Sequence, residues 1–140
     1  CAASLGYRRL ADRLGIADHL FMPGRVSPNE TAAYYEMLDV VVIPRRPFAV
    51  CEIVSPMKPL EAAAHGKRVL MSDVAPLADL VDFCQNFSCF SKGSVASLVN
   101  KLTEILQFPI TPLPRCEALG EMTWDSNIRP MVSAIQELEP

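Results

Sequence analysis

Four consecutive β-branched residues, Val40 to Ile43, lie between Asp39 and Pro44. A continuous apolar run of this length is typical of a strand buried on both faces, as strands of a parallel sheet are. Parallel strands must be joined by a crossover connection, which is usually a helix. The run therefore predicts an α/β chain in which strands and helices alternate.

The rest of the sequence shows this alternation. Short apolar runs predict further strands at 19–22, 67–71 and 87–90. Amphipathic runs with start and stop signals predict helices at 4–15, 28–38, 56–65, 77–83, 95–106 and 124–138. Such an order implies right-handed βαβ units and a parallel sheet with helices on both faces. Because the chain opens with a helix, we expect a first strand to lie upstream of it.

The predicted strands all lie within residues 1–107, which we expect to form one domain. Residues 108–114 hold three prolines and predict an irregular crossing of the surface. A last helix should follow, with Thr123 as its N-cap and Pro130 as a kink inside it. Residues 108–140 are therefore predicted to be a crossing segment and a terminal helix.

The segment from Cys51 to Gly66 predicts a loop that runs into a helix. Ser55 is a good N-cap, Pro56 suits the first helical position, and Gly66 suits a left-handed C-cap. Lys58 then stands near the positive end of the helix dipole, where an acid is normally preferred. Either Lys58 points into water or pairs with Glu61, or an anion binds at this helix start.

Basic side chains follow the ends of two predicted strands, and ligands of open α/β sheets bind at the carboxyl ends of the strands. The first set is Gly24, Arg25 and Val26; the second is Arg45 and Arg46; Ser55 to Lys58 lie close by, and Ser72-Asp73 would be a fourth piece. Such a set suits a phosphate or a diphosphate. Glu61 could accept hydrogen bonds from the paired hydroxyls of a ribose. The alternatives are plain ion pairs, Arg25 with Glu30 and Glu61 with Lys58.

Composition excludes several classes of function. The net charge is −3, so no broad field favours nucleic acid, and no apolar run is long enough to span a bilayer. The cysteines are odd in number and show no metal-ligand spacing, which favours reduced thiols in a cytosolic setting; they are Cys1, Cys51, Cys84, Cys89 and Cys116. Two isolated histidines predict no metal site.

Several stretches carry a resemblance to a known family. They are Val42-Ile43-Pro44-Arg45, the run from Glu52 to Val69, Phe21 to Val26, and Thr123-Trp124. They resemble the C-terminal, donor-binding domain of GT-B glycosyltransferases, and more narrowly the retaining family called group 1 or family 4. The resemblance implies a Rossmann-like parallel sheet flanked by helices, which forms one half of a GT-B architecture.

The resemblance also implies roles for individual residues. Glu61 matches the second glutamate of an E-x7-E motif and would bind the ribose. The first glutamate matches Glu52, which would act on the donor sugar as the catalytic candidate, although eight residues separate the two and strict spacing would select Ile53. The remaining donor-binding candidates are Gly24, Arg25 and Val26 at the nucleobase, and Arg45, Val54, Ser55, Pro56, Met57 and Lys58 at the diphosphate and sugar. A basic pair that the family places earlier is absent from this sequence.

The implied function is the donor-binding half of a retaining, hexosyltransferase-type glycosyltransferase. It would use a UDP- or GDP-sugar as substrate, without a metal ion or another cofactor. Its partner would be an N-terminal acceptor domain of the same polypeptide, without which the fragment should be inactive. We expect a cytoplasmic location, with a membrane surface reached only through that other domain. The alternatives are a nucleotide-sugar epimerase domain and a non-catalytic flavodoxin-like or receiver-type signalling domain.

Overall fold

The computed structural model describes residues 2–109, 111, 113–121 and 124–136. It divides into two compact units, Cys1–Ala32 and Ala33–Pro140, and each is described by itself. The predicted cap Thr123 lies outside the described residues. No helix in the described ranges is both long and apolar enough to cross a membrane.

The first unit is helical where we predicted both a helix and a strand. Helix α1 (Ala2–Leu14) confirms the first prediction. The strand predicted at 19–22 is wrong, since Ala17–His19 forms a 3₁₀ helix and residues 20–27 form no regular element. The backbone N–H groups of His19 and Leu20 bond to carbonyl oxygens of Ile16 and Ala17. Local hydrogen bonds thus replace the ladder that a strand would need.

The predicted capping box at Ser27 is present. The Glu30 carboxylate accepts hydrogen bonds from the Ser27 hydroxyl at 2.7 Å and from the Ser27 N–H at 3.0 Å. These bonds, the hydroxyl first, hold the pKa of Glu30 below its usual value. A 3₁₀ turn, Pro28–Glu30, leads into α2 (Thr31–Met37). Glu30 therefore serves the helix start, and it does not form the ion pair with Arg25 that was the alternative to a ligand site.

The second unit contains a parallel sheet, as predicted. Its described strands are β1 (Val40–Ile43), β2 (Arg68–Ser72) and β3 (Phe87–Phe90), in the order β1-β2-β3. Val41 pairs with Val69, and Met71 pairs with Cys89, so all three strands run the same way. The α/β fold class, a parallel sheet flanked by helices, is confirmed.

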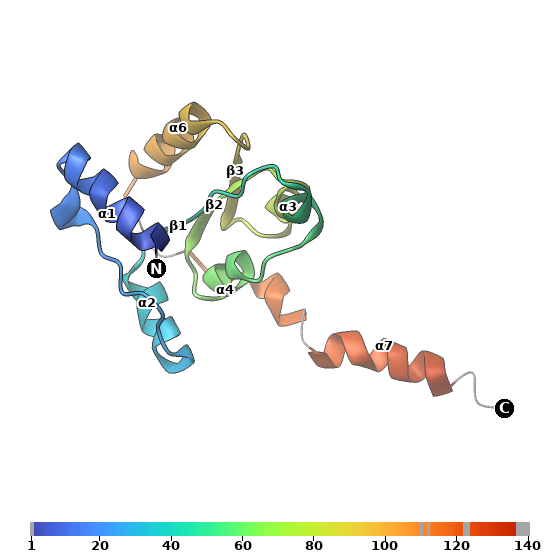
Figure 1. Cartoon of the computed structure of the whole chain (residues 1–140). Helices are drawn as coiled ribbons and strands as arrows, with labels where there is room; N and C mark the ends of the chain where they lie inside the picture. The colour runs from blue at the N-terminus through green and yellow to red at the C-terminus, as the bar shows by residue number, and fades with distance from the viewer. Residues whose placement is uncertain (1, 110, 112, 122–123, 137–140) are drawn as a thin grey trace. The chain divides into compact units, whose positions relative to one another are not determined.

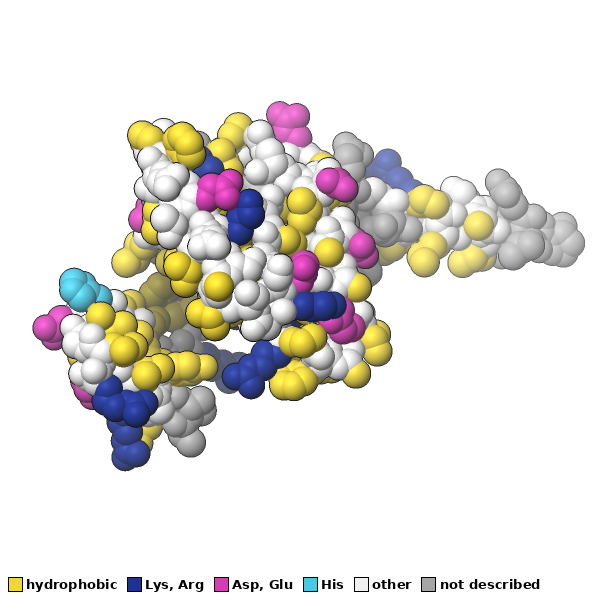
Figure 2. All heavy atoms as spheres, turned by 90° about the horizontal axis from the view of Figure 1, so that it is seen from above, with side chains coloured by type: hydrophobic (Ala, Val, Ile, Leu, Met, Phe, Trp, Pro, Cys, Tyr) yellow, Lys and Arg dark blue, Asp and Glu magenta, His cyan; other side chains and the backbone are white. Residues whose placement is uncertain are grey.

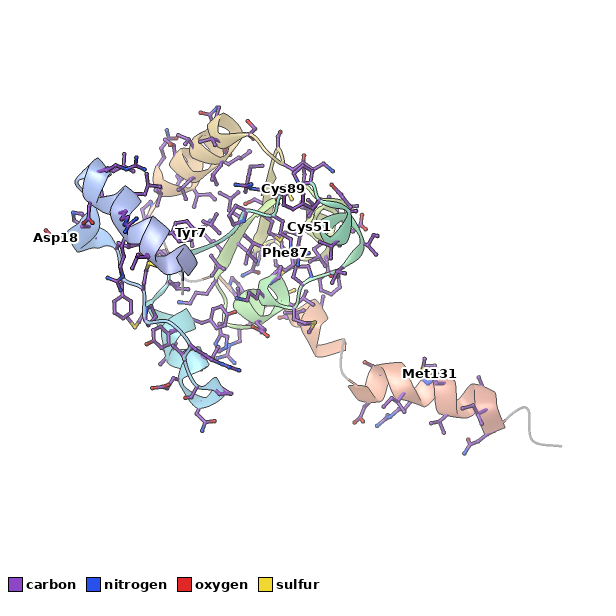
Figure 3. All side chains as sticks on the ribbon, viewed as in Figure 1. Tyr7, Asp18, Cys51, Phe87, Cys89 and Met131 are labelled. Atoms are coloured by element: carbon purple, nitrogen blue, oxygen red, sulfur yellow. The ribbon has the colours of Figure 1, made fainter. Side chains whose placement is uncertain are left out.

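The centre of the sheet is β2, which is buried on both faces. Val69 and Met71 join one core cluster with Ala62, Ala63 and Leu77, whereas the buried Leu70 points to the opposite face. Helices α3 and α4 lie on one side of the sheet and α6 on the other (Figure 1). Figure 3 shows Cys51 of α3 near Phe87 and Cys89 of β3, and all three belong to or pack against this cluster.

Strand β1 departs from the prediction that its run is buried on both faces. Val41 and Ile43 pack against the core cluster, but Val42 is 37% exposed. Helix α6 packs over β2 and β3, so it gives this side of β1 less cover. The β-branched run therefore predicted the strand correctly, but the prediction that both of its faces are buried is wrong.

The connection from β1 to β2 holds two helices, where we predicted a loop and one helix. Helix α3 (Ala49–Ile53) lies within the predicted loop, and α4 spans Lys58–Ala64. The predicted N-cap Ser55 is wrong, because Met57 holds that position and Pro59 is the proline of the first turn. Ser55 precedes a proline, which disfavours the helical region for its backbone. Lys58 is consequently the first helical residue.

Gly66 ends α4 as predicted. Its φ is +68°, in the left-handed region, and the preceding His65 is the C-cap. The crossing segment passes directly over it, because the Leu113 N–H donates to the Gly66 carbonyl at 3.2 Å. A Cβ added at Gly66 would lie 2.6 Å from the Leu113 carbonyl oxygen. The position therefore requires glycine for two reasons, its φ and the close approach of another backbone.

The remaining elements complete the second unit. After β2 come the short α5 (Ala75–Ala78) and a 3₁₀ turn, Val81–Phe83, where we predicted one helix at 77–83. Ser94 caps α6 (Val95–Leu106) as predicted, since its Oγ accepts from the Ser97 N–H. A 3₁₀ turn, Glu117–Glu121, precedes α7 (Trp124–Gln136), which contains Pro130.

We predict that Gly66→Ala lowers the free energy of unfolding by about 2–5 kcal/mol, from left-handed strain and overpacking together. Gly93→Ala is the matched control, because Gly93 has φ +77° with no atom within 4 Å of an added Cβ. It should cost only the strain, about 1–2 kcal/mol. Urea unfolding of both variants measures the difference. Equal losses would contradict the close approach of the crossing segment.

Candidate functional site

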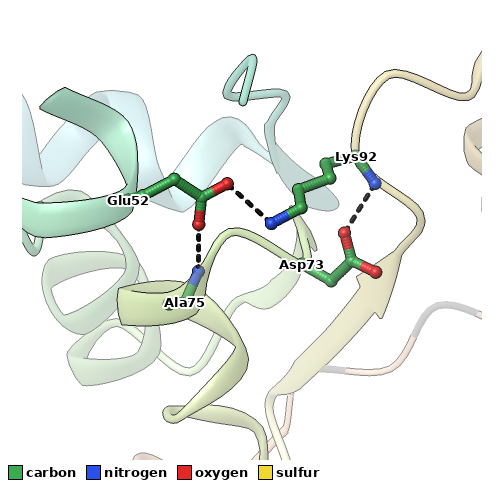
Figure 4. A network of polar contacts seen from close by, with 4 residues as sticks. All are labelled: Glu52, Asp73, Ala75 and Lys92. Carbon is green, nitrogen blue, oxygen red and sulfur yellow. Dashed lines mark hydrogen bonds and ion pairs between the residues drawn. The ribbon is translucent and has the colours of Figure 1, made fainter. Parts of the chain in front are cut away.

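The carboxyl ends of the three described strands gather polar and charged residues. Arg45 follows β1 by two residues, Asp73 follows β2 directly, and Lys92 follows β3 by two. Glu52 reaches the same edge from α3 (Figure 4). Since parallel strands present their carboxyl ends on one side, this edge is where a ligand of an α/β sheet is expected.

Glu52 is the most highly connected residue of this edge. One carboxylate oxygen pairs with the Lys92 ammonium at 2.6 Å, and the other accepts from the Ala75 N–H, at the start of α5, at 2.9 Å. The Lys92 backbone N–H in turn donates to Asp73 at 2.6 Å (Figure 4). Glu52 thus ties α3 to the turns that follow β2 and β3.

These contacts fix the charge state of Glu52. The hydrogen bond from Lys92, followed by that from the Ala75 N–H, lowers the pKa of the carboxyl group below its usual value of 4.5. The side chain is 29% exposed, so it stays open to solvent. Glu52 is therefore an oriented, ionised carboxylate that can accept further hydrogen bonds, for example from hydroxyl groups.

Arg45 holds the loop before α4. Its guanidinium donates to the Val54 carbonyl at 2.6 Å, so the predicted site residue contacts the predicted site segment. The Val54 N–H donates to Val50 and is not free for a ligand. Ser55 and Met57 are exposed, and Pro56 between them is half-buried and has no N–H to offer. Arg45 and this loop are brought together, although neither Val54 nor Pro56 offers a free N–H to a ligand.

Lys58 and Glu61 do not form the ion pair that was one interpretation of this helix. Glu61 instead accepts a hydrogen bond at 3.0 Å from the hydroxyl of Tyr35, whose ring stacks on His65 at 5.0 Å. Burial, and then the contact with Glu61, raises the pKa of Tyr35 to about 12. The phenol therefore stays a donor at physiological pH. Within the described ranges the exposed Lys58 has no ion-pair partner.

The first unit holds the other predicted set, Gly24, Arg25 and Val26. Gly24 has φ +83°, Gly24 and Arg25 are exposed, and Val26 is partly buried. They follow an irregular segment rather than a strand, so the sheet-edge argument for them fails. Their assignment to a nucleobase stays a prediction from the resemblance.

Sequence reasoning missed Lys92 and overlooked the partners of Glu52. The signal for Lys92 was available, since it follows a predicted strand as Arg45 does. The signal for the ion pair was not available, because Glu52 and Lys92 are 40 positions apart and Glu52 lies on an unpredicted helix.

Over the face shown in Figure 2, basic and acidic side chains of the larger unit lie interspersed rather than in patches of one sign. Within the described ranges no three acidic, His or Cys side chains gather in a group that could hold a metal ion.

The chain is an α/β protein with a parallel sheet whose carboxyl edge carries polar and charged side chains. The model of the family glycosyl transferases group 1 matches residues 5–123, which is most of the chain. The chain therefore belongs to the group 1 glycosyltransferases, and this membership supports glycosyl transfer as its function. No curated protein and no solved structure matched it significantly.

We predict that Lys92→Met raises the pKa of the Glu52 carboxyl toward its usual value, because it removes the largest of the contacts that lower it. A titration of the side-chain carboxyl signals by NMR measures the shift. Lys101→Met is the control, since Lys101 pairs with Glu104 at 2.9 Å on the exposed surface of α6. An unchanged Glu52 titration in Lys92→Met would show that the pair does not persist in solution.

The same pair predicts a pH dependence of stability. A carboxyl group with a lowered folded-state pKa stabilises the fold above its unfolded pKa, and this contribution is lost as the pH falls through the folded value. At neutral pH the free energy of unfolding of the wild type should therefore exceed that of Glu52→Gln, and this difference should disappear as the pH falls below about 4.5. Thermal unfolding of both proteins between pH 7 and about pH 3 tests this. A constant difference over that range would contradict it.

Proposed function

We propose that this chain is the donor-binding half of a retaining glycosyltransferase of GT-B architecture, with a nucleotide sugar such as a UDP- or GDP-sugar as donor. The family match over residues 5–123 carries the proposal. The sheet edge supports it, because Glu52, Arg45 and the loop before α4 lie on one unit and offer both acidic and basic groups. The acceptor would bind to a further domain of the same polypeptide.

Glu61 suits a ribose. Tyr35 occupies its Oε2, and the exposed carboxylate keeps other lone pairs for the two hydroxyls of the sugar. Because the Tyr35 phenol donates and stays protonated, it orients the carboxylate without neutralising it. A carboxylate held in this way accepts hydrogen bonds from hydroxyls more strongly than a neutral group does.

Cationic groups would serve the diphosphate. Lys58 is exposed and unpaired by any described carboxylate, and Arg45 has guanidinium N–H groups beyond the one that holds Val54. In a front-face displacement these donors would stabilise the departing nucleoside diphosphate, and no metal ion is required for that role. Glu52, ionised and fixed by Lys92, would accept hydrogen bonds from the donor sugar.

The proposal predicts that the chain binds one nucleoside diphosphate among UDP, GDP and ADP, measured by isothermal titration calorimetry. Glu61→Ala should weaken that binding about 10- to 150-fold, because a hydrogen bond to a charged group contributes about 1.5–3 kcal/mol. Glu104→Ala is the matched control, since it removes an exposed glutamate from α6. Tyr35→Phe should give a smaller loss, because the carboxylate remains.

Two outcomes would count against the proposal. The first is failure of the folded chain to bind any of the three diphosphates at millimolar concentration. The second is equal weakening by Glu61→Ala and Glu104→Ala, which would mean that Glu61 makes no specific contact. Circular dichroism of each variant confirms that the comparison is made between folded proteins.

A further inference from the structure

Two cysteines of the described residues are buried, Cys84 and Cys116, and they lie near each other, away from the sheet edge. The Cys84 thiol donates a hydrogen bond to the Asn86 side-chain oxygen at 2.9 Å. The amide nitrogen of Asn86 donates to the Pro114 carbonyl at 3.4 Å, and Cys116 is two residues further on. Cys84 and Cys116 are 8% and 9% exposed and belong to the same core cluster. The fold thus joins thiols that are 32 positions apart in the sequence.

The two thiols also share a cavity. It has a volume of about 460 Å³ and is lined by both cysteines, with Asn86, Pro114 and Arg115 among its other walls. Burial, and then the neighbouring Cys116 thiol, raises the pKa of Cys84 to about 11, so the thiolate that disulfide exchange requires becomes more abundant as the pH rises. Both thiols therefore border the same cavity, from opposite segments of the chain.

Within the described residues, two backbone hydrogen bonds and one from the Asn86 side chain attach the segment that carries Cys116 to the rest of the unit. Its backbone hydrogen bonds are long, 3.2 Å from Leu113 to Gly66 and 3.4 Å from Cys116 to Ala63. Ala118 and Leu119 add partly buried apolar contacts. A covalent link between Cys116 and Cys84 would tie the crossing segment to the loop before β3.

We propose that Cys84 and Cys116 form a thiol pair that is converted to a disulfide by oxidised glutathione or a similar low-molecular-weight disulfide, and that this bridge locks residues 113–121 onto the unit. The proposal is independent of the nucleotide site, because neither cysteine lies at the sheet edge. It assigns a reversible modification site to residues that the glycosyl-transfer proposal does not use.

The chemistry balances as a thiol–disulfide exchange. One thiol of the pair, as a thiolate, attacks a sulfur of the glutathione disulfide and releases one glutathione thiolate. The second thiol loses its proton and attacks the mixed disulfide, which forms the protein bridge and releases the second glutathione. Two protein thiols are oxidised, and one glutathione disulfide is reduced to two thiols.

The test is to treat the folded full chain with oxidised glutathione, block free thiols, and map tryptic peptides without reduction. Peptides 69–92 and 116–140 should be found joined, with loss of two hydrogen atoms. Because Cys84 and Cys89 share a peptide, Cys89→Ser is the matched control and should form the bridge fully. Cys84→Ser and Cys116→Ser should give glutathione adducts instead. After cleavage at Arg115, the peptide with residues 116–140 should stay attached only in the oxidised wild type and Cys89→Ser.

The peptide map of the oxidised wild type tests the bridge even if a serine variant does not fold. Glutathione adducts on Cys84 or Cys116 without a bridge would overturn the proposal, as would a bridge from either cysteine to a different partner. Absence of any reaction at these two thiols in a chain shown to be folded by circular dichroism would overturn it as well. The bridge should also raise the apparent melting temperature, and dithiothreitol should reverse the rise.

Discussion

The parallel pairing of β2 with β1 on one side and β3 on the other is the interaction on which the rest of the described second unit depends. Val69 to Ser72 are buried, so their backbone groups have no access to water and must bond within the sheet. Parallel pairing then forces each connection to cross back over the sheet, and that places α4 and α5 against it. It also brings the ends of the strands, and the residues that follow them, to one edge.

The edge in turn depends on a few polar contacts rather than on a helix dipole. Helix α4 has only seven residues and Lys58 is exposed to solvent, so the electrostatic misfit of a lysine at its start is small. The stronger constraint is Glu52, whose two oxygens bond to the turns after β2 and β3. Arg45 holds the loop between α3 and α4 through one carbonyl, that of Val54. These contacts link the connections that surround the candidate site.

The sequence allowed the strands of the sheet to be predicted because their signal is local. The runs at Val40 and Arg68 are rich in apolar residues that favour strands, and the left-handed Gly66 marks a helix end by its own chemistry. The run at 19–22 was misread because apolar residues without a partner strand do not make a ladder. Helix α3 was missed because prolines and arginines around it resemble a loop. The partners of Glu52 and Glu61 come from distant elements, which no local pattern encodes.

The two glutamates suggested by the family motif accept hydrogen bonds from different donors: those of Glu52 include a charged ammonium group, and that of Glu61 is a neutral phenol. Glu52 bonds to an ammonium and a backbone N–H, so its charge is largely compensated and its pKa is lowered. Glu61 accepts a hydrogen bond from the neutral phenol of Tyr35, whose pKa is raised to about 12. The phenol orients the Glu61 carboxylate but does not compensate its negative charge. A carboxylate with a compensated charge is suited to a fixed, hydrogen-bonding role beside a reacting centre, where excess negative charge would repel a diphosphate. An uncompensated carboxylate is better suited to the neutral hydroxyls of a ribose. The pair of environments therefore favours different tasks for the two residues.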